Sequence, residues 1–489
     1  MQDWNSQLIK QNTNNIIMNL KKLLNNPLTY IIIASPFLLY AITLLLPVHD
    51  DWSYCTTPYY DFGEKFIYRV LPWYSYWRPW DGLFGYFLSL HKELFPTLNH
   101  IAVYTAHLVC TFLIYRLSGT LGFKTYSKNI STIFFFISPA MLGTVFGIDS
   151  LNQAYAQMWG LAATTAYIEI KNKWRVPLWL ALALIGTFSK ENGITFFVIP
   201  QLLAWSMGRI TLRQAVKDTV WAALVVVAYF STRIALTNTN VYINDAYLEN
   251  TITRKLKNVA VFIGMTWIPL DYVSLWHAPN RNLLIVALTL IISTPFIIYI
   301  FFSKPKNLLT REALGLIACM LIAASPHLVT LFTAMHPYAS LGISALIVGY
   351  LTDKMDNKKL LYILFAMFIA STMFVDWHHW QKSYESGMTG KKMGEEAVRK
   401  INKPVDKVYI ITIDRGETKY SSFCAIPNDA FGWGLSMYAE TGYKWPETIF
   451  NTSVKEKETY KIDSIAEDAL AKGYEKVILV HGDTVDVIR

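Results

Sequence analysis

The chain has 489 residues, of which 53% are hydrophobic and 16% are charged, and its mean hydropathy is +0.28. Soluble domains carry about 25% charged residues, so this composition excludes an ordinary soluble protein and indicates an integral membrane protein. The formal net charge of +9 is explained by the basic cytoplasmic loops of such a protein, so we expect no binding to nucleic acid.

The first long apolar run, residues 28–48, carries no charge and is long enough to cross a bilayer. It exceeds the core of a signal peptide, and no small-residue cleavage site follows it, so we expect a retained anchor with a cytoplasmic N-terminus. The acids Asp50 and Asp51 come directly after it. Acids beside a membrane span are seldom present without a role. The aromatic-rich segment 52–80, which includes Arg78, therefore predicts a substrate cleft at the membrane interface.

Ten further apolar stretches bring the predicted number of membrane crossings to eleven. They lie at residues 98–117, 130–148, 153–170, 176–188, 194–207, 219–237, 282–303, 312–325, 338–352 and 360–376. Residues 256–270 could be a twelfth crossing or a helix in the membrane interface. The positive-inside rule favours the interfacial helix, because eleven crossings make every cytoplasmic loop basic, whereas the outer loops at 149–152 and 327–337 contain no Lys or Arg.

After about residue 376 the composition becomes charged and soluble in character. KVYIITID (residues 407–414) and KVILVHGD (476–483) predict two buried strands, and IDSIAEDALAKG (462–473) predicts a helix that ends at a glycine. This segment has no glycine-rich phosphate loop, so we assign it no catalysis. Acceptor docking and a purely structural role both stay open.

The predicted fold is an all-α polytopic membrane protein of about eleven helices with a small C-terminal α/β domain. Residues 1–376 are expected to form the membrane domain, with residues 48–97 as its first outer loop. Residues 377–489 are expected to form the soluble domain on the outer, periplasmic face.

The four cysteines show no spacing typical of a zinc site. Cys110 and Cys319 fall in apolar helices, where packing roles are expected. Cys55 and Cys424 both fall on the outer side, where an oxidising compartment would allow a disulfide.

The predicted topology gathers acids and bases from distant parts of the chain on the outer face. They include His49, Asp50, Asp51, Arg78 and Asp81 in the first loop, Asp149 in the second, Lys190 and Glu191 in the third, Asp271 in the fourth, and His327 and His336 in the fifth. Such a set suits a reaction in which a carboxylate deprotonates an acceptor hydroxyl while cations stabilise a departing phosphate.

Two other functions are compatible with the same charges. A transporter or flippase of a lipid-linked sugar would line its pathway with them, although these charges lie at the outer surface and no inverted pair of broken helices is evident. A glycan polymerase or ligase would use outer-loop Arg and His residues without needing an early acid pair.

Four blocks of sequence, in this order, resemble the GT-C superfamily of membrane glycosyltransferases. The blocks are HDDWSY, YWRPWDGLFGYFL with LFPTLNHIAVYTAHLVCTFLIYRL, SPAMLGTVFGIDSLNQAYA, and TFSKENGITFFVIP. The resemblance is to the branch of the transmembrane tetratricopeptide O-mannosyltransferases and their bacterial relatives, and it covers residues 28–205. Further on it rests on topology and on MHPYASLG (335–342), which has His336 where the family has an arginine. No tetratricopeptide repeats follow the membrane part.

The resemblance implies transfer of a sugar from a polyprenyl-phosphate donor, such as undecaprenyl phosphate, to a hydroxyl group of a glycan, lipid or protein. Small bacterial enzymes that modify O-antigen in lipopolysaccharide match this size and layout. The implied location is the periplasmic face of a bacterial inner membrane, where nucleotide sugars are absent. The sequence requires no cofactor, and a divalent metal stays open.

The resemblance also implies roles for particular residues. A first-loop acid serves as general base, and of the two we expect Asp51 to be the base and Asp50 to orient the acceptor or a metal. The donor phosphate is expected to be held by Arg78, Lys190 and His336. Secondary roles near the acceptor are expected for Asp149, Glu191 and His49.

Overall fold

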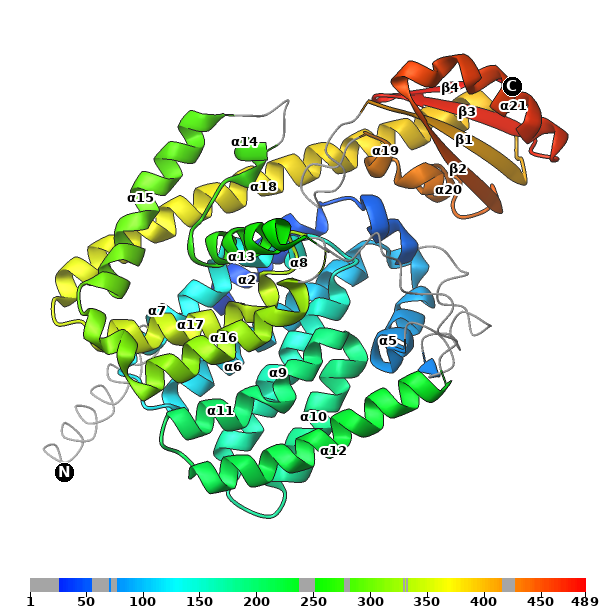
Figure 1. Ribbon diagram of the computed structural model, residues 1–489. Coiled ribbons are helices and arrows are strands. Elements are labelled where there is room, and N and C mark those ends of the chain that lie inside the picture. The colour runs from blue at the N-terminus through cyan, green and yellow to red at the C-terminus, as the bar shows by residue number, and fades with distance from the viewer. Residues whose placement is uncertain are drawn as a thin grey trace, which may run out of the picture.

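A computed structural model of the chain describes residues 26–54, 70–71, 77–236, 251–276, 282–328, 330, 333–415 and 427–489. The protein is mostly helical, with a four-stranded sheet near its C-terminus, which confirms the coarse features of the predicted fold. Figure 1 shows a large bundle of helices and a small sheet domain, with the long helix α18 (Lys358–Ile401) reaching from one to the other.

The bundle contains helices of very different lengths. They are α2 (Pro27–Thr43), α5 (Pro79–Ser89), α6 (Thr97–Thr120), α7 (Thr125–Ile137), α8 (Leu142–Val145), α9 (Leu151–Glu169), α10 (Arg175–Ser189), α11 (Ile199–Ser206), α12 (Leu212–Leu236), α13 (Ile252–Trp267), α14 (Tyr272–Trp276), α15 (Leu283–Phe302), α16 (Arg311–Leu328), α17 (Tyr338–Asp353) and α18. The 3-10 segments η1 (His49–Tyr54) and η4 (Glu191–Phe197) carry candidate site residues.

Asparagine side chains mark the start of three apolar helices. Asn26 accepts a hydrogen bond from the backbone N–H of Leu28 at the start of α2, where Pro27 occupies the first position. Asn282 and Asn357 cap α15 and α18 in the same way. A side-chain oxygen at this position satisfies a backbone donor that has no partner within the helix, so these caps set the helix boundaries.

Among the described residues, five helices are long and apolar enough to cross a membrane: α6, α12, α15, α16 and α18. The apolar helices α2 and α10 are shorter. Several helices of this kind indicate a membrane protein. Each predicted apolar stretch coincides with helical structure, but residues 130–148 are divided between α7, a 3-10 turn and α8, and residues 194–207 between η4 and α11. The helix lengths therefore do not establish eleven full crossings.

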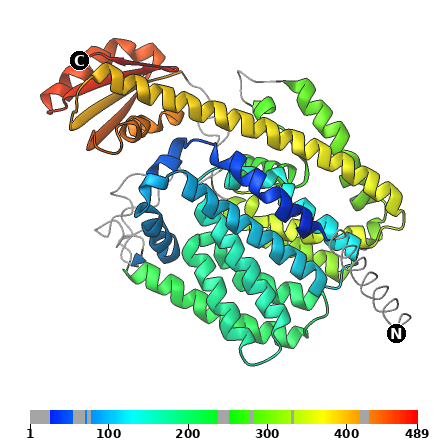
Figure 2. The same cartoon turned by 180° about the vertical axis from the view of Figure 1, so that it is seen from behind.

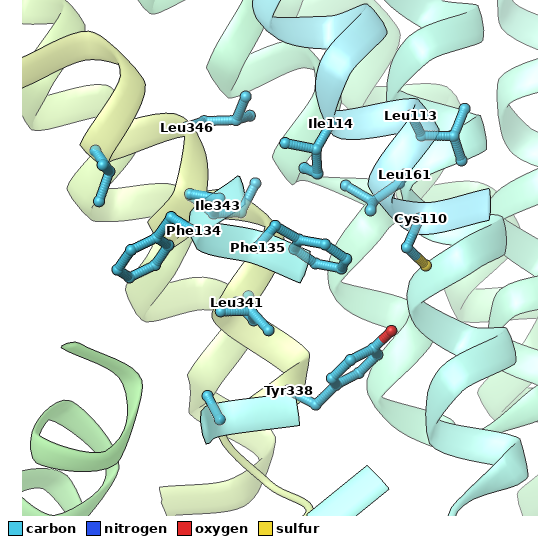
Figure 3. Close-up of a cluster of buried hydrophobic side chains, with 14 of the residues drawn as sticks. Cys110, Leu113, Ile114, Phe134, Phe135, Leu161, Tyr338, Leu341, Ile343 and Leu346 are labelled. Atoms are coloured by element: carbon cyan, nitrogen blue, oxygen red, sulfur yellow. The ribbon is translucent and has the colours of Figure 1, made fainter. Parts of the chain in front are cut away.

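Helix α17 lies at the centre of the bundle, and all of its residues except the last are buried. Figure 3 shows how side chains of α17, including Tyr338 and Leu341, meet Phe134 and Phe135 of α7 and Cys110 of α6. The Tyr338 hydroxyl also lies 3.0 Å from Nδ1 of the buried His107. This packing fixes the N-terminal end of α17, and with it the preceding fifth loop.

The sheet domain is built from β1 (Lys407–Asp414), β2 (Thr448–Lys455), β3 (Lys476–His481) and β4 (Thr484–Val487). The strand order is β2-β1-β3-β4, with the first three strands parallel and β4 antiparallel to β3. The end of α18 packs on one face with α19 (Pro427–Ala430) and α20 (Leu435–Glu440), and α21 (Ile462–Ala471) packs on the other. The two strands and the helix expected here from sequence are present, whereas β2 and β4 were not predicted.

Helix α18 does not end near residue 376 but continues unbroken into the sheet domain. Figure 2 shows it running beside α2 before it reaches the sheet, and Trp380 Nε1 donates to the Ala41 carbonyl of α2 at 2.8 Å. The buried Asp271 holds α18 from another side, because His378 Nδ1 and His379 Nε2 lie 2.7 and 3.3 Å from its carboxylate oxygens. The sheet domain is thereby fixed beside the end of α2, where η1 begins.

Candidate functional site

The first-loop acids lie on η1, directly after the apolar helix α2. The chain turns sharply there, because His49 has a φ of +52°, which residues other than glycine seldom adopt. Backbone conformations of this kind are concentrated at functional sites. The turn gives Asp50 and Asp51 quite different surroundings.

Asp51 is buried and tied to the second loop. Its Oδ1 accepts hydrogen bonds from the backbone N–H groups of Ile148 (2.6 Å) and Asp149 (2.8 Å), and its Oδ2 accepts one from Val48 (3.3 Å). Burial and the nearby Asp149 carboxylate raise the pKa of Asp51, against the opposing effect of these donors. Asp51 is only 4% exposed, and its side chain joins the first loop to the backbone at the start of the second.

Asp50 faces outward beside His49. Its side chain is 54% exposed, and its Oδ2 lies 3.2 Å from Nδ1 of His49. Burial lowers the pKa of His49, but the hydrogen bond to Asp50 and the carboxylates of Asp50, Asp429 and Asp149 outweigh that effect and raise it. Asp50 is therefore the more accessible of the two acids, whereas the sequence analysis preferred Asp51 as the base.

Asp149 lies near both the first-loop acid Asp50 and the cation Lys190. It lies before α9, and Ser150 Oγ donates to its Oδ1 at 3.0 Å. Burial and the Asp50 carboxylate raise the pKa of Asp149, whereas Lys190 and His49 act in the opposite direction. Asp149 therefore lies close enough to Asp50, His49 and Lys190 for the charge of each to shift its pKa.

Lys190 has neighbouring site residues on several different loops. It caps the end of α10, and its Nζ lies 3.3 Å from Met335 Sδ in the fifth loop. Burial and then the Arg78 charge lower the pKa of Lys190 to about 8, against the opposing effect of three acids, Asp149, Glu191 and Asp81. This ammonium group is partly buried among several loops, where it is accessible to a negatively charged ligand atom.

Arg78 is held in place by Glu191. Its Nη2 and Nε donate to the Glu191 carboxylate at 2.7 to 3.1 Å, in the bidentate geometry that fixes a guanidinium plane. Burial raises the pKa of Glu191, but Arg78 and Arg233 outweigh it and hold that pKa low. Three cations, Arg78, Lys190 and Arg233, thus surround one carboxylate.

Arg233 was not predicted from the sequence. It lies near the end of the apolar helix α12, with Nη2 3.7 Å from Glu191 Oε1 and Nη1 donating to the Tyr229 hydroxyl at 3.1 Å. Tyr229 in turn stacks on Trp77, with ring centroids 5.3 Å apart. A lone arginine inside a predicted span was the signal that could have identified it, because ionisable groups in such segments are often functional.

His336 in the fifth loop has a buried imidazole ring. Burial, His327 and Lys190 hold its pKa well below the ordinary value, so the ring is neutral at pH 7. The backbone N–H of Thr333 donates to Nδ1, and the ring stacks on His327 with centroids 4.2 Å apart. A neutral imidazole can donate a hydrogen bond from Nε2, but it cannot replace the arginine charge expected at this position.

Helix α8, which precedes the second loop, touches the fifth loop through its backbone. A Cβ atom at Gly143 of α8 would lie 2.3 Å from the Ala334 carbonyl group, so only glycine permits this approach. The contact brings Met335 against both Lys190 and Ser150. The eight residues proposed from the sequence, His49, Asp50, Asp51, Arg78, Asp149, Lys190, Glu191 and His336, are thereby linked in one region at one end of the bundle.

The sheet domain also reaches this region, which the sequence did not predict. Trp52 Nε1 donates to the Ala430 carbonyl at 3.4 Å, and the His49 ring meets the Trp433 ring edge to face at 4.8 Å. Asp429 lies close enough to raise the pKa of His49. The domain to which no catalysis was assigned therefore contacts His49 and Trp52, the residues on either side of the acid pair.

The remaining predictions concern cysteines and metals. Cys110 and Cys319 are buried free thiols, and the proposed Cys55 and Cys424 pair lies outside the described residues. Within the described ranges, no group of three or more His, Cys, Asp or Glu side chains is arranged to hold a metal ion.

Comparisons with protein-family models, with curated proteins and with solved structures found no match to this chain.

Proposed function

We propose that the protein is a glycosyltransferase that moves a sugar from a polyprenyl-phosphate donor to a hydroxyl group of an acceptor at the outer face of a membrane. The observation that carries this proposal is that an exposed carboxylate, Asp50, and a partly buried cation, Lys190, come from different loops and both lie near the Asp149 carboxylate. The resemblance of the same loops to GT-C enzymes supports the proposal.

Asp50 is proposed as the general base. A sugar or protein hydroxyl holds its proton far above neutral pH, so a base must accept that proton as the oxygen attacks the anomeric carbon. The exposed Asp50 carboxylate can reach an incoming hydroxyl, and His49 orients it through the 3.2 Å contact. Asp51 is proposed to hold the loop in position through its three backbone hydrogen bonds.

The cations are proposed to stabilise the leaving group. As the new bond forms at the anomeric carbon, the bond to the phosphate oxygen breaks, and its electron pair stays on the phosphate. Fixed positive charge near that oxygen lowers the activation free energy of the transfer, because it stabilises the negative charge that develops there. Lys190 and Arg78 are placed for this role, with Arg78 oriented by Glu191 and Arg233 adding charge behind it.

The apolar helices around the site suit a lipid-linked donor. The aromatic wall of Trp77 and Tyr229 beside Arg233 is of the type found where a membrane meets water. In this proposal eleven crossings place the N-terminus in the cytoplasm and the sheet domain in the periplasm of a bacterial inner membrane. The acceptor is proposed to be a lipid-linked or surface glycan, such as O-antigen.

The test is a transfer assay on the purified full chain with a panel of polyprenyl-phosphate sugars and a membrane glycolipid extract, read by mass spectrometry. Wild type should add one sugar mass to an acceptor, and Asp50→Asn should lose that product. Glu93→Gln is the matched control, because Glu93 is an exposed first-loop acid whose nearest charged partner is His91. If wild type forms no product with any donor, or if Asp50→Asn matches Glu93→Gln, the proposal fails.

A further inference from the structure

The sheet domain contains a pocket at the carboxyl ends of its parallel strands. Its volume is about 300 Å³, and its wall includes Asp414 at the end of β1, Arg415 after it, Asn451 and Ser453 on β2, and Gly482 after β3. In open α/β sheets, ligands bind outside the carboxyl ends of the strands where the connections diverge. Here the chain passes from β1 to β2 along the face of α19 and α20, and from β2 to β3 along the face of α21.

The polar groups of the pocket match a neutral, hydroxyl-rich ligand. Besides Asp414 and Arg415, the wall contains Asn428 and Asp429 at the start of α19. Carboxylate, amide and guanidinium groups can each form hydrogen bonds with two neighbouring hydroxyls. A few such groups are enough to fix the orientation of a ligand in a small pocket. The two acids balance the one arginine and the imidazole of His49, so the pocket has no excess of positive charge, which disfavours a phosphate and favours a neutral sugar.

Aromatic groups complete the pocket on the side of the membrane domain. The Trp433 ring lies in the wall, and the wall also includes His49 from the first loop. An indole face packs well against the apolar face of a sugar ring. His49 is the residue next to Asp50 and contacts its carboxylate. One residue therefore borders both the pocket and the proposed base.

The contact between the domains is closely fitted at this point. Gly432 has a φ of +59°, and a Cβ atom there would lie 2.2 Å from Cδ1 of Trp52. Trp52 donates to the Ala430 carbonyl, and Asn451 Nδ2 donates to the Trp433 carbonyl at 2.8 Å, so both sides of the contact are fixed. A ligand in the pocket would therefore be held at a set position relative to Asp50.

We propose that this pocket is the acceptor site, and that it binds a neutral sugar unit of the acceptor glycan so that a neighbouring hydroxyl reaches Asp50. The proposal rests on the proposed function and adds to it the class of acceptor. The sheet domain thus has a substrate-binding role, while the donor lipid is bound on the other side of Asp50, at Lys190 and Arg78.

Two variants test the pocket without altering the acid pair. Asp414→Asn removes a charged acceptor of hydrogen bonds from the wall, and Ser453→Tyr fills the pocket from an exposed position on β2. Asp463→Asn is the matched control, because Asp463 is an exposed acid in the first turn of α21, on the opposite face of the sheet. Thermal unfolding of each full-length variant checks that the fold is kept.

The first measurement is ligand-observed NMR of the full chain with methyl glycosides of neutral hexoses and deoxyhexoses, and with inorganic phosphate as the anionic comparison. Wild type, Asp463→Asn and Asp50→Asn should bind at least one glycoside at millimolar concentration and should not bind phosphate in the pocket. Asp414→Asn and Ser453→Tyr should bind that glycoside about tenfold more weakly or not at all. Absence of glycoside binding by wild type, or equal binding by all variants, overturns the proposal.

The second measurement separates this proposal from the proposed function. With donor present, the two pocket variants should raise the KM for the acceptor about tenfold or more, and they should leave the slow hydrolysis of the donor by water unchanged. Transfer with an unchanged acceptor KM in both variants overturns the acceptor site and leaves the glycosyltransferase proposal standing. If wild type binds glycosides but neither transfers nor hydrolyses the donor, the proposed function fails, and the acceptor role fails with it.

Discussion

Replacing Asp50 and Asp51, one at a time, by asparagine should show which acid is the general base and which one holds the loop in position. Asp50→Asn changes a side chain that is 54% exposed, with His49 as its contact. The unfolding free energy should change little, whereas removal of a general base lowers the rate of sugar transfer by a factor of about 10² to 10⁴. The purified variant should therefore unfold like wild type and be almost inactive.

Asp51→Asn should have the opposite result. The new amide oxygen can still accept from the N–H groups of Ile148 and Asp149, but the amide nitrogen would face the N–H of Val48, where Oδ2 now accepts at 3.3 Å. An unsatisfied buried donor costs about 1–3 kcal/mol. Relief from burying a charge offsets part of that cost, so we expect a loss of about 1–2 kcal/mol with a substantial part of the activity retained.

The truncation Asp51→Ala leaves all three donors without their acceptor. At about 1–2 kcal/mol for each, the protein should lose about 3–6 kcal/mol and fold poorly. Denaturant unfolding in detergent and the transfer assay, applied to all three variants, provide the measurements. The reasoning is refuted if Asp51→Asn folds like wild type and is inactive while Asp50→Asn remains active.

Three further changes probe the cations and the domain contact. The pKa of about 8 for Lys190 means that its charge is lost as pH rises through that value, so kcat/KM should fall about tenfold per pH unit above pH 8, and Lys190→Arg should move this fall to higher pH. Glu191→Gln breaks the bidentate hold on Arg78 and should lower kcat/KM about tenfold, with the donor KM rising. Gly432→Ala forces a Cβ atom against Trp52 and should lower the unfolding free energy by about 1–3 kcal/mol, as measured by thermal unfolding.

The chain offers a control for each of these changes. An alkaline fall that is unchanged in Lys190→Arg would contradict the role of Lys190. Glu93→Gln should leave the donor KM unaltered, and an equal rise in both glutamine variants would contradict the role of Glu191. Gly442 has a φ of +66° and open space around it, so Gly442→Ala has the same backbone cost without the clash. If it destabilises as much as Gly432→Ala, the contact with Trp52 contributes nothing.

Much of the fold follows from local patterns that the sequence displays directly. Long apolar runs predict the helices of the bundle, and the runs of Val and Ile at 407–414 and 476–483 predict β1 and β3. Strand β2 was missed because TIFNTSVK alternates at the edge of the sheet, where most of its side chains are partly or fully exposed. The length of α18 was missed because its apolar half and its charged half look like separate segments.

The sequence indicated which charged residues come together at one end of the bundle but not the surroundings of each side chain. The difference between Asp50 and Asp51 depends on backbone donors at Ile148 and Asp149, almost a hundred residues away, and no pattern around the acid pair reveals it. In the same way, the neutral state of His336 depends on burial beside Lys190 and His327. Such effects arise only when distant loops meet.

The pocket in the sheet domain likewise could not be predicted from local sequence patterns. Its polar residues come from two strands, a short helix and the loops beside them, and each one alone looks like an ordinary surface residue. The position of His49 at its edge depends on how α18 places the sheet beside η1. Local sequence therefore predicted a soluble domain and left acceptor docking open, and the placement of the domain beside η1 supports the binding role that we propose.

The most direct test of the central claim is to follow the lipid product. Wild type reconstituted in vesicles with a polyprenyl-phosphate sugar and an acceptor glycan should release free polyprenyl phosphate in a one-to-one ratio with the glycosylated acceptor, as measured by mass spectrometry of the lipid and glycan fractions. Recovery of intact donor on the opposite side of the vesicle membrane, with no free polyprenyl phosphate and no glycosylated acceptor, would contradict glycosyl transfer and identify a transporter.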